Sequence, residues 1–278
     1  MRKPDSGLVW AILTTVLCCM PFGIVQGITE FLPVSSSGHL QIAKELLGVR
    51  IEENLTFDVL LHAGTVLSTV VILRSEIAGL VRGLFTPRFN EEKAYVLKLL
   101  LSMIPIGIVG LLFMDRINRM LESPAILLIV GAMLLLTAGL LAFANRSKAR
   151  RRERISYRDA FIIGIAQACA AMPGLSRSGS TIATGLLLGN RKEAVARFSF
   201  LMVLAPIIGQ TLLNVLDAGG LPAAGIGALP LAAGFAASFV TGCLACKFML
   251  GIVRRGRLIW FALYCAAAGT AAILSYLL

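Results

Sequence analysis

Charged residues are scarce in this sequence. Only 15% of its 278 residues are Asp, Glu, Lys or Arg, whereas 57% are apolar and the mean hydropathy is +0.84. A soluble domain has roughly 25% charged residues, so the composition makes a soluble enzyme improbable and favours an integral membrane protein. The same figures exclude a disordered chain, a collagen-like chain and a secreted disulfide scaffold.

Signals of other protein classes are absent as well. Arg2 and Lys3 precede an apolar run, but no small-x-small cleavage pattern follows, so we expect the run to stay in the mature protein. Cys243 and Cys246 form a C-x-x-C without a second pair or a nearby histidine, which favours small apolar helix residues over a redox or metal pair. The net charge of +11 has no aromatic-basic module beside it, so we expect no nucleic-acid partner.

Six apolar runs have about the 20 residues that a transmembrane helix needs. They cover residues 56–74, 94–114, 124–144, 194–216, 228–250 and 258–277. Two further apolar stretches, 8–47 and 157–189, are each interrupted in the middle by Pro, Gly and Ser. Broken backbone at membrane depth must be buried in protein or line a polar cavity. The pattern predicts an all-α polytopic membrane protein with six transmembrane helices and two re-entrant helical hairpins.

The two hairpins align without a gap at an offset of 141 residues. Identical pairs include Gly23 and Gly164, Ile24 and Ile165, Gln26 and Gln167, Ser35 and Ser176, Ser37 and Ser178, and Gly38 and Gly179. Each hairpin precedes three predicted spans, and an odd number of spans inverts the second copy. We therefore predict a single membrane domain, 1–278, built from inverted-topology repeats at about 8–144 and 157–277. Ser36 of the first repeat falls opposite Arg177 of the second.

Basic residues orient these elements. Residues 146–158 contain seven Lys and Arg, so the loop 145–156 that joins the repeats should be cytoplasmic. If each predicted span crosses the membrane, the segments on the same side as this loop hold 17 Lys and Arg, and the segments on the opposite, outer side hold six. Both termini then face outside, and the first hairpin enters the membrane from that side.

Few ionisable residues lie within the predicted membrane segments, and such residues are functional candidates. Gln26 and Glu30 are four residues apart and share a helix face, so their oxygens could hold a hard divalent cation. The alternative is that they only bond the broken backbone nearby. Arg177, in the second break, has a fork that suits two phosphate oxygens, with Ser176, Ser178 and Thr181 as further donors. Its alternative is a structural ion pair with Glu30.

Three serines, Ser35, Ser36 and Ser37, open a short helix in the first break. One serine is explained as a helix cap, whereas three beside a helix N-terminus also suit an anion. His39 lies one turn after Ser36, and a serine with a histidine at hydrogen-bond distance is a nucleophile with its base. The combined set suits phosphoryl transfer to or from an anionic headgroup whose tail stays in lipid.

These residues resemble a known family. QGITEFLPVSSSGH (residues 26–39) and PGLSRSGST (residues 173–181) are similar to the two signature motifs of the bacterial undecaprenyl-pyrophosphate phosphatases, the family linked to bacitracin resistance. The resemblance extends over essentially the whole chain. It implies a cytoplasmic-membrane enzyme that dephosphorylates undecaprenyl pyrophosphate, recycles the lipid carrier of cell-wall synthesis and needs Mg²⁺ or Ca²⁺. It also implies a pocket that opens to the periplasmic side.

The resemblance assigns roles residue by residue. The acidic metal motif falls on Gln26 and Glu30, although only Glu30 is charged here, where some members carry two glutamates. The serine nucleophile falls on Ser36, the motif histidine on His39 and the phosphate-clamping arginine on Arg177. Whether Ser36 or His39 attacks phosphorus stays open. The partners expected are the lipid substrate and membrane lipid, with a homodimer as the candidate assembly.

Two other functions fit parts of the pattern. Inverted repeats with paired broken helices also describe secondary carriers, so a transporter that flips a polyprenyl phosphate is the competing class. Against pure transport stands the reactive set of Ser36, His39 and Glu30. An intramembrane serine protease is a weaker alternative, because such a site has little use for Arg177.

Overall fold

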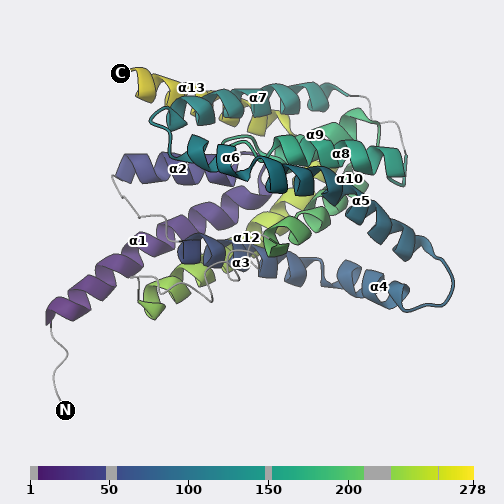
Figure 1. The fold of residues 1–278 in the computed structure, drawn as a ribbon, viewed down its shortest axis with the longest axis horizontal. Helices are drawn as coiled ribbons and strands as arrows, with labels where there is room; N and C mark the ends of the chain where they lie inside the picture. The colour runs from purple at the N-terminus through teal and green to yellow at the C-terminus, as the bar shows by residue number, and fades with distance from the viewer. Residues whose placement is uncertain (1–5, 48–54, 148–151, 210–226, 256) are drawn as a thin grey trace, which may run out of the picture.

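The described residues of the protein, in a computed structural model, form a helical bundle (Figure 1). They are residues 6–47, 55–147, 152–209, 227–255 and 257–278. The helices are α1 (Ser6–Phe31), α2 (Ser36–Leu47), α3 (Leu55–Ile72), α4 (Arg74–Leu84), α5 (Glu91–Leu112), α6 (Met114–Leu121), α7 (Ile126–Arg146), α8 (Tyr157–Cys169), α9 (Arg177–Leu187), α10 (Lys192–Met202), α12 (Ala228–Arg255) and α13 (Ile259–Leu277). The described part of the chain holds no β-strand beyond an isolated bridge between Arg152 and Asn190.

Membrane-crossing helices are present, as the sequence predicts. In the described residues α5, α7, α12 and α13 are long and apolar enough to span a bilayer. Helices α3 and α4 would form a fifth span, but they are bent by 77° at Leu73. The chain is therefore a multi-pass, all-helical membrane protein. Helices α4 and α6 lie in segments predicted as loops.

One predicted run differs in its helical structure. The run 194–216 is interrupted at Val203, where α10 has just ended, and a helical segment resumes at 204–209. The remainder of this run, 210–216, lies outside the described residues, as does 148–151 of the predicted basic loop.

Both predicted helix breaks are confirmed. In the first, α1 ends at Phe31 and α2 begins at Ser36. In the second, α8 ends at Cys169 and α9 begins at Arg177. The first stretch contains Pro33 and the second Pro173, and proline removes a backbone donor that a continuing helix would need.

Small residues bring the long helices together. Helix α1 packs along α12 and α8 packs along α5, while α7 packs against α13. A side chain at Gly23 would collide with the backbone of Gly234 on α12, and one at Gly164 would collide with Ser102 on α5. Apolar surface gains little from leaving lipid, so close backbone approach through small residues is what holds membrane helices together. Gly23 and Gly164 are 141 residues apart, the offset of the sequence repeat.

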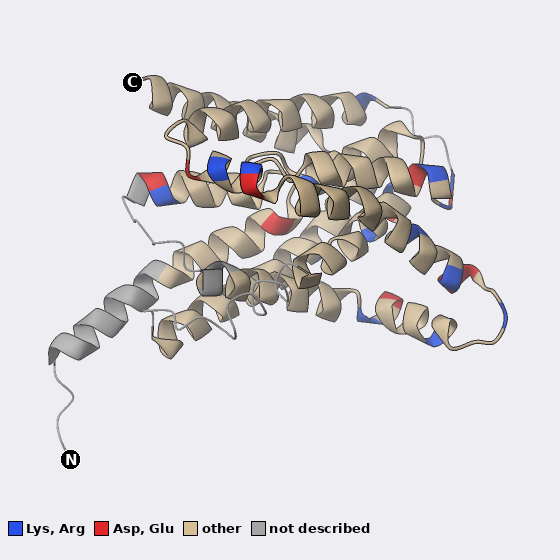
Figure 2. Cartoon of the chain, viewed as in Figure 1, with Lys and Arg blue, Asp and Glu red and all other residues tan. Residues whose placement is uncertain are grey.

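Lys and Arg gather toward one end of the bundle, where α4 turns into α5 and α7 ends (Figure 2). The middle of the bundle is mostly uncharged. There Phe31, at the end of α1, is 1% exposed and packs edge-to-face on Phe200 of α10, with ring centroids 5.6 Å apart. This contact fixes the end of α1, and with it the neighbouring Glu30.

Candidate active site

The two breaks meet in the centre of the bundle. A side chain at Gly38, in the first turn of α2, would lie 3.2 Å from the Cα of Gly174 in the second break. The hydroxyl of Ser178 donates to the carbonyl of Leu32 across this junction, at 3.1 Å. Gly174 has a φ of +89° and lies against the backbone of Val130 on α7, so a side chain there would be both strained and obstructed. The breaks therefore form one structural centre.

Each break starts its second helix with the same serine cap. The Ser35 Oγ accepts from the Gly38 N–H at 3.2 Å, and the Ser176 Oγ accepts from the Gly179 N–H at 3.0 Å. Residues 35 and 176, like residues 38 and 179, are separated by 141 positions. The cap predicted for one serine is thus present in both breaks. It leaves Ser36, Ser37 and Ser178 with hydroxyls that the caps do not need.

Glu30 joins the two breaks. Its side chain is 3% exposed, and its Oε1 pairs with the guanidinium of Arg177. Its Oε2 accepts from Ser36 Oγ at 2.7 Å and from Gln26 Nε2 at 3.0 Å. The two carboxylate oxygens therefore face an arginine on one side and a serine hydroxyl on the other. The pair of Glu30 and Arg177, weighed above as a structural alternative, exists in this arrangement.

His39 does not share a hydrogen bond with Ser36, contrary to the geometry expected from their spacing. Its Nδ1 lies 2.8 Å from the carbonyl oxygen of Ser35, and its Nε2 lies 2.7 Å from the hydroxyl of Tyr264 on α13. The rings of His39 and Tyr264 stack, with centroids 5.5 Å apart and an interplanar angle of 13°. A carbonyl only accepts, so Nδ1 carries the proton, and in the neutral ring the phenol donates to Nε2. Both ring nitrogens are engaged away from Ser36.

The backbone explains this difference. Ser35 has a φ of +71°, in the left-handed region that is uncommon for a residue other than glycine. Its carbonyl accepts from both the backbone N–H of His39, at 3.2 Å, and the His39 ring. This turn directs the hydroxyl of Ser36 toward Glu30. The helical spacing of three residues does not reveal such a turn.

A cavity of about 720 Å³ opens beside the site. One wall is polar and holds Glu30, Ser35, Ser36, Ser37, His62, Gln167, Ser176, Arg177 and Ser178. The other wall is mainly apolar and comes from α5, α6 and the segment after α10. Cavities of this size hold small molecules, and an apolar wall with converging polar groups suits an amphipathic ligand.

Most of the predicted catalytic, phosphate-binding and metal-binding residues share this cavity. The exceptions are Gln26, Thr181 and His39, which are not among its lining residues. Gln26 is fully buried behind Glu30. Thr181 is 1% exposed, donates to the carbonyl of Arg177 at 2.8 Å and lies 2.5 Å from the hydroxyl of Ser199. Thr181 thus contacts the backbone of Arg177, whereas the prediction had it facing phosphate.

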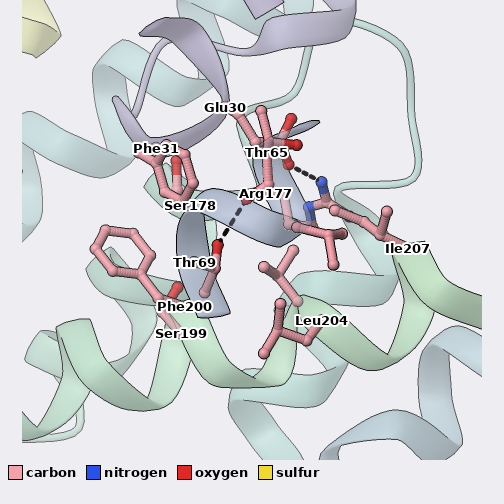
Figure 3. A pocket seen from close by; sticks show the side chains of 12 residues that line it. Glu30, Phe31, Thr65, Thr69, Arg177, Ser178, Ser199, Phe200, Leu204 and Ile207 are labelled. Atoms are coloured by element: carbon pink, nitrogen blue, oxygen red, sulfur yellow. Dashed lines mark hydrogen bonds and ion pairs between the residues drawn. The ribbon is translucent and has the colours of Figure 1, made fainter. Parts of the chain in front are cut away.

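A much smaller pocket lies on the other side of the Glu30–Arg177 pair (Figure 3). Its volume is about 10 Å³, roughly the space for one water molecule. Hydroxyls of Thr65, Thr69 and Ser199 line it, together with Phe31 and Phe200 and other apolar residues. Thr65 and Thr69 donate to carbonyls of their own helix, at 2.8 and 3.1 Å. Their oxygens still offer lone pairs to the pocket.

The oxygen donors near Glu30 fit a hard cation only if the substrate completes its coordination. The described residues contain no group of three or more His, Cys, Asp or Glu side chains that could hold a metal. Glu30 supplies one carboxylate at the cavity wall, and Gln26 Oε1 is a buried oxygen without a hydrogen-bond partner. Mg²⁺ is commonly held by one or two carboxylates together with substrate phosphates and waters. The donor set matches this kind of site.

Several contributing residues escaped the sequence analysis. Tyr264 lies 225 residues from His39, inside an apolar helix that gave no signal of its role. Thr137 of α7 accepts from the backbone N–H of Ser176 at 3.1 Å and so anchors the second break. Gln167 carried a signal, because it aligns with Gln26. His62 of α3 also lies on the cavity wall.

Comparison with known proteins gives one family. The family model described as "Bacitracin resistance protein BacA" matches residues 19–271. An "Undecaprenyl-diphosphatase" of Parabacteroides distasonis is 58% identical over 258 residues, which are 92% of this chain and 96% of that protein. A Bacteroides fragilis protein of the same name is 56% identical over 253 residues, covering 90% and 94% of the two chains.

A more distant relative has the same extent. "Undecaprenyl-diphosphatase 1" of Bacillus cereus is 36% identical over 262 residues, which are 91% of this chain and 95% of that protein. The similarity therefore covers both breaks and nearly all helices.

Proposed function

Because the chain belongs to the family of the bacitracin resistance protein BacA, we propose that it hydrolyses undecaprenyl diphosphate to undecaprenyl phosphate and inorganic phosphate within the membrane. The names of its relatives support this substrate. The observation that carries the proposal is the junction of the breaks, where Glu30 binds both Ser36 and Arg177 at the polar wall of a large cavity. The apolar wall suits the first part of a polyprenyl tail.

Arg177 is the electrostatic clamp in this proposal. Its side chain is 27% exposed and lies on the cavity wall, whereas that of Glu30 is 3% exposed. A diphosphate entering the cavity competes with Glu30 for the guanidinium, whose fork matches two phosphate oxygens. The clamp neutralises charge on the transferred phosphoryl group, which is the main requirement of phosphoryl transfer.

Ser36 is the nucleophile and Glu30 its base. As Ser36 Oγ attacks the terminal phosphorus, its proton passes to Glu30 Oε2, 2.7 Å away. The bond between that phosphorus and the bridging oxygen breaks, and undecaprenyl phosphate leaves with the electron pair. Water then attacks the phosphoserine, the Ser36 oxygen recovers a proton, and inorganic phosphate departs.

His39 is a positioning residue in this scheme. Its Nδ1–H and its backbone N–H both hold the Ser35 carbonyl, and the hydroxyl of Tyr264 holds the opposite ring nitrogen. Together they stabilise the left-handed turn that points Ser36 at Glu30. Because neither nitrogen has a lone pair directed at Ser36, the geometry favours Glu30 over His39 as base and Ser36 over His39 as nucleophile.

A divalent cation, Mg²⁺ or Ca²⁺, belongs to the proposal. Glu30 would hold it, with the buried amide oxygen of Gln26 as a further donor. When bound, the cation would neutralise charge on the phosphates. If Arg177 leaves Glu30 to bind phosphate, the carboxylate of Glu30 would become available to hold the cation.

We further propose six transmembrane helices and two re-entrant hairpins in an inverted repeat, within the bacterial cytoplasmic membrane. The pairing of α1 with α12 and of α8 with α5 supports the repeat, because it exchanges equivalent elements of the two halves. The cavity wall includes Ile106, Gly110 and Ile117, toward the end of α5 and in α6, which the basic-residue pattern assigns to the outside. The site would therefore open to the periplasmic side.

This orientation fits a role in recycling the lipid carrier of peptidoglycan synthesis. The description of the family names bacitracin resistance, and we propose the same link for this enzyme.

Phosphate release from a polyprenyl diphosphate by the purified protein in detergent tests the proposal. We expect release that requires Mg²⁺ or Ca²⁺, stops with excess chelator and returns when the metal is restored. Absence of release from well-folded protein would contradict a phosphatase. Lipid movement in proteoliposomes would then test the transporter.

A further inference from the structure

Gln167 is a buried amide whose hydrogen-bonding capacity is almost unused. Its side chain lies on α8, is 1% exposed and forms part of the cavity wall. Its Oε1 has no hydrogen-bond partner, and its Nε2 reaches only the sulfur of Met103, at 3.9 Å. A thioether is a weak acceptor, and buried polar groups are generally satisfied. The amide is therefore suited to a ligand that enters the cavity.

The sequence repeat shows what the amide lacks. In the first hairpin, Gln26 donates its Nε2 to Glu30, one helical turn later. In the second, the residue one turn after Gln167 is Ala171, and it too lines the cavity. The second hairpin thus keeps the donor but replaces the carboxylate with a methyl group.

An anion with oxygen acceptors matches this arrangement. Ser176, Arg177 and Ser178 line the same cavity and are donors of hydrogen bonds. A carboxylate beside Gln167 would add a second negative charge to a wall that already holds Glu30, whereas alanine leaves the position free for a phosphate. The chemistry of the wall is therefore that of a phosphate-binding surface with the amide as an additional donor.

We propose that Gln167 is a substrate-binding residue, whose Nε2 donates to a phosphate oxygen of the diphosphate group. This inference depends on the proposed function and extends it. The diphosphate occupies, in the second hairpin, the position equivalent to the Glu30 carboxylate of the first. Gln26 and Gln167 thereby have different tasks in equivalent places, since one holds the base and the other holds the substrate.

Steady-state kinetics of two Gln167 variants test this role. Gln167→Met keeps the length of the side chain and removes the amide, and Gln167→Glu keeps the shape and adds a negative charge. A hydrogen bond to a charged group is worth about ten- to hundred-fold in binding. We expect KM for a polyprenyl diphosphate to rise by about this factor in Gln167→Met, with kcat within about threefold, and to rise further in Gln167→Glu. A KM within twofold of the wild type in both variants would overturn the proposal.

Restoring a carboxylate gives a second, independent test. Ala171→Glu would supply Gln167 with the partner that Gln26 has, and would place a negative charge where the diphosphate is expected. Ala171→Gln has the same size without the charge. We expect a KM at least about tenfold higher for Ala171→Glu than for Ala171→Gln, and equal values would contradict the proposal. Cys169→Ala, an exposed position of α8 outside the cavity lining, serves as control.

A binding measurement separates this inference from the proposed function. Calorimetry with inorganic pyrophosphate compares wild type and Gln167→Met without turnover of a lipid substrate. Weaker binding by the variant supports Gln167 even if no phosphate release is found, whereas equal binding overturns it even if the enzyme is active. Thermal unfolding of each variant establishes that the compared proteins are folded.

Discussion

The two helix breaks of this protein share their framework and differ in their chemistry. Both begin the second helix with a serine that caps the glycine three residues later, Ser35 with Gly38 and Ser176 with Gly179. The first break, however, has Ser35 at a φ of +71°, whereas Ser176 has a φ of −68°. The same cap therefore accommodates two different backbones.

The side chains beyond the cap differ in charge. The first hairpin carries the carboxylate of Glu30 and the hydroxyl of Ser36, and the second carries Arg177 at the position equivalent to Ser36. One hairpin can thus supply a nucleophile with its base, and the other can supply positive charge for phosphate. A repeated scaffold becomes a site when its two copies diverge at the few positions that face each other.

The strongest test of this division of labour replaces the nucleophile. Ser36→Ala should lose at least about 10³-fold in kcat, because the phosphoserine can no longer form. Ser180→Ala is the matched control, since Ser180 is a buried serine of α9 whose hydroxyl has no hydrogen-bond partner and which lies outside the cavity lining. Phosphate release by both purified variants is the measurement. Substantial turnover in Ser36→Ala would exclude Ser36 as nucleophile.

The ion pair between the breaks can be tested for structure and function separately. Arg177→Met leaves the buried Glu30 charge without its partner, and Glu30→Gln leaves the partly buried Arg177 charge; each change is expected to cost about 3 kcal/mol or more of stability. The double variant Glu30→Gln/Arg177→Met should recover most of this stability. Its phosphate release should stay about 10²-fold or more below the wild type, because base and clamp are both missing.

Denaturant unfolding in mixed micelles, measured beside phosphate release, distinguishes the two roles. If Arg177→Met is destabilised but fully active, the pair is purely structural. If it is stable and inactive, the arginine acts on the substrate alone.

A smaller effect is expected from the contact that holds the left-handed turn. Tyr264→Phe removes the hydrogen bond to His39 and keeps the stacked ring. We expect kcat to fall about three- to tenfold with KM unchanged, and the pH profile to keep its shape, because His39 positions Ser35 and does not take a proton. A shift of the acidic limb of the profile, where a general base becomes protonated, would instead assign the base to His39.

The smallest effect is expected at the anchor of the second break. Thr137→Val removes the acceptor of the Ser176 N–H while keeping the size of the side chain. The variant should lose about 1–3 kcal/mol of stability, because a buried backbone donor loses its partner. Phosphate release should remain within about threefold of the wild type. A large loss of activity without a loss of stability would give Thr137 a direct part in catalysis.

Local features of the fold were predictable from the sequence. The apolar runs at 124–144 and 258–277 correspond closely to α7 and α13, because a long uncharged run has few alternatives in a bilayer. Both breaks were predictable from Pro and Gly. The bend at Leu73 was not, since no proline or glycine lies at that break. The interruption at Val203 lies one turn before Pro206, which lacks the N–H that the carbonyl of Met202 would accept, so the sequence does carry a signal for it.

The candidate site was only partly predictable. The sequence indicated Glu30, Ser36 and Arg177, because charged and clustered hydroxyl residues in a broken membrane helix have few structural explanations. It did not indicate Tyr264 or the true contacts of His39. It placed Thr181 with the phosphate-binding residues, whereas its hydroxyl bonds the carbonyl of Arg177.

The sequence by itself determined the membrane class, most of the long helices, the two breaks and the residue types within them, since these follow from hydrophobic length and from backbone hydrogen bonding among near neighbours. Tertiary structure alone decided which side chains share a hydrogen bond. Glu30 and Arg177 are 147 residues apart, and the left-handed turn at Ser35 sends Ser36 to Glu30 and His39 to Tyr264. Such contacts depend on how helices pack across the bundle and on single backbone angles, and neither is encoded in a local pattern.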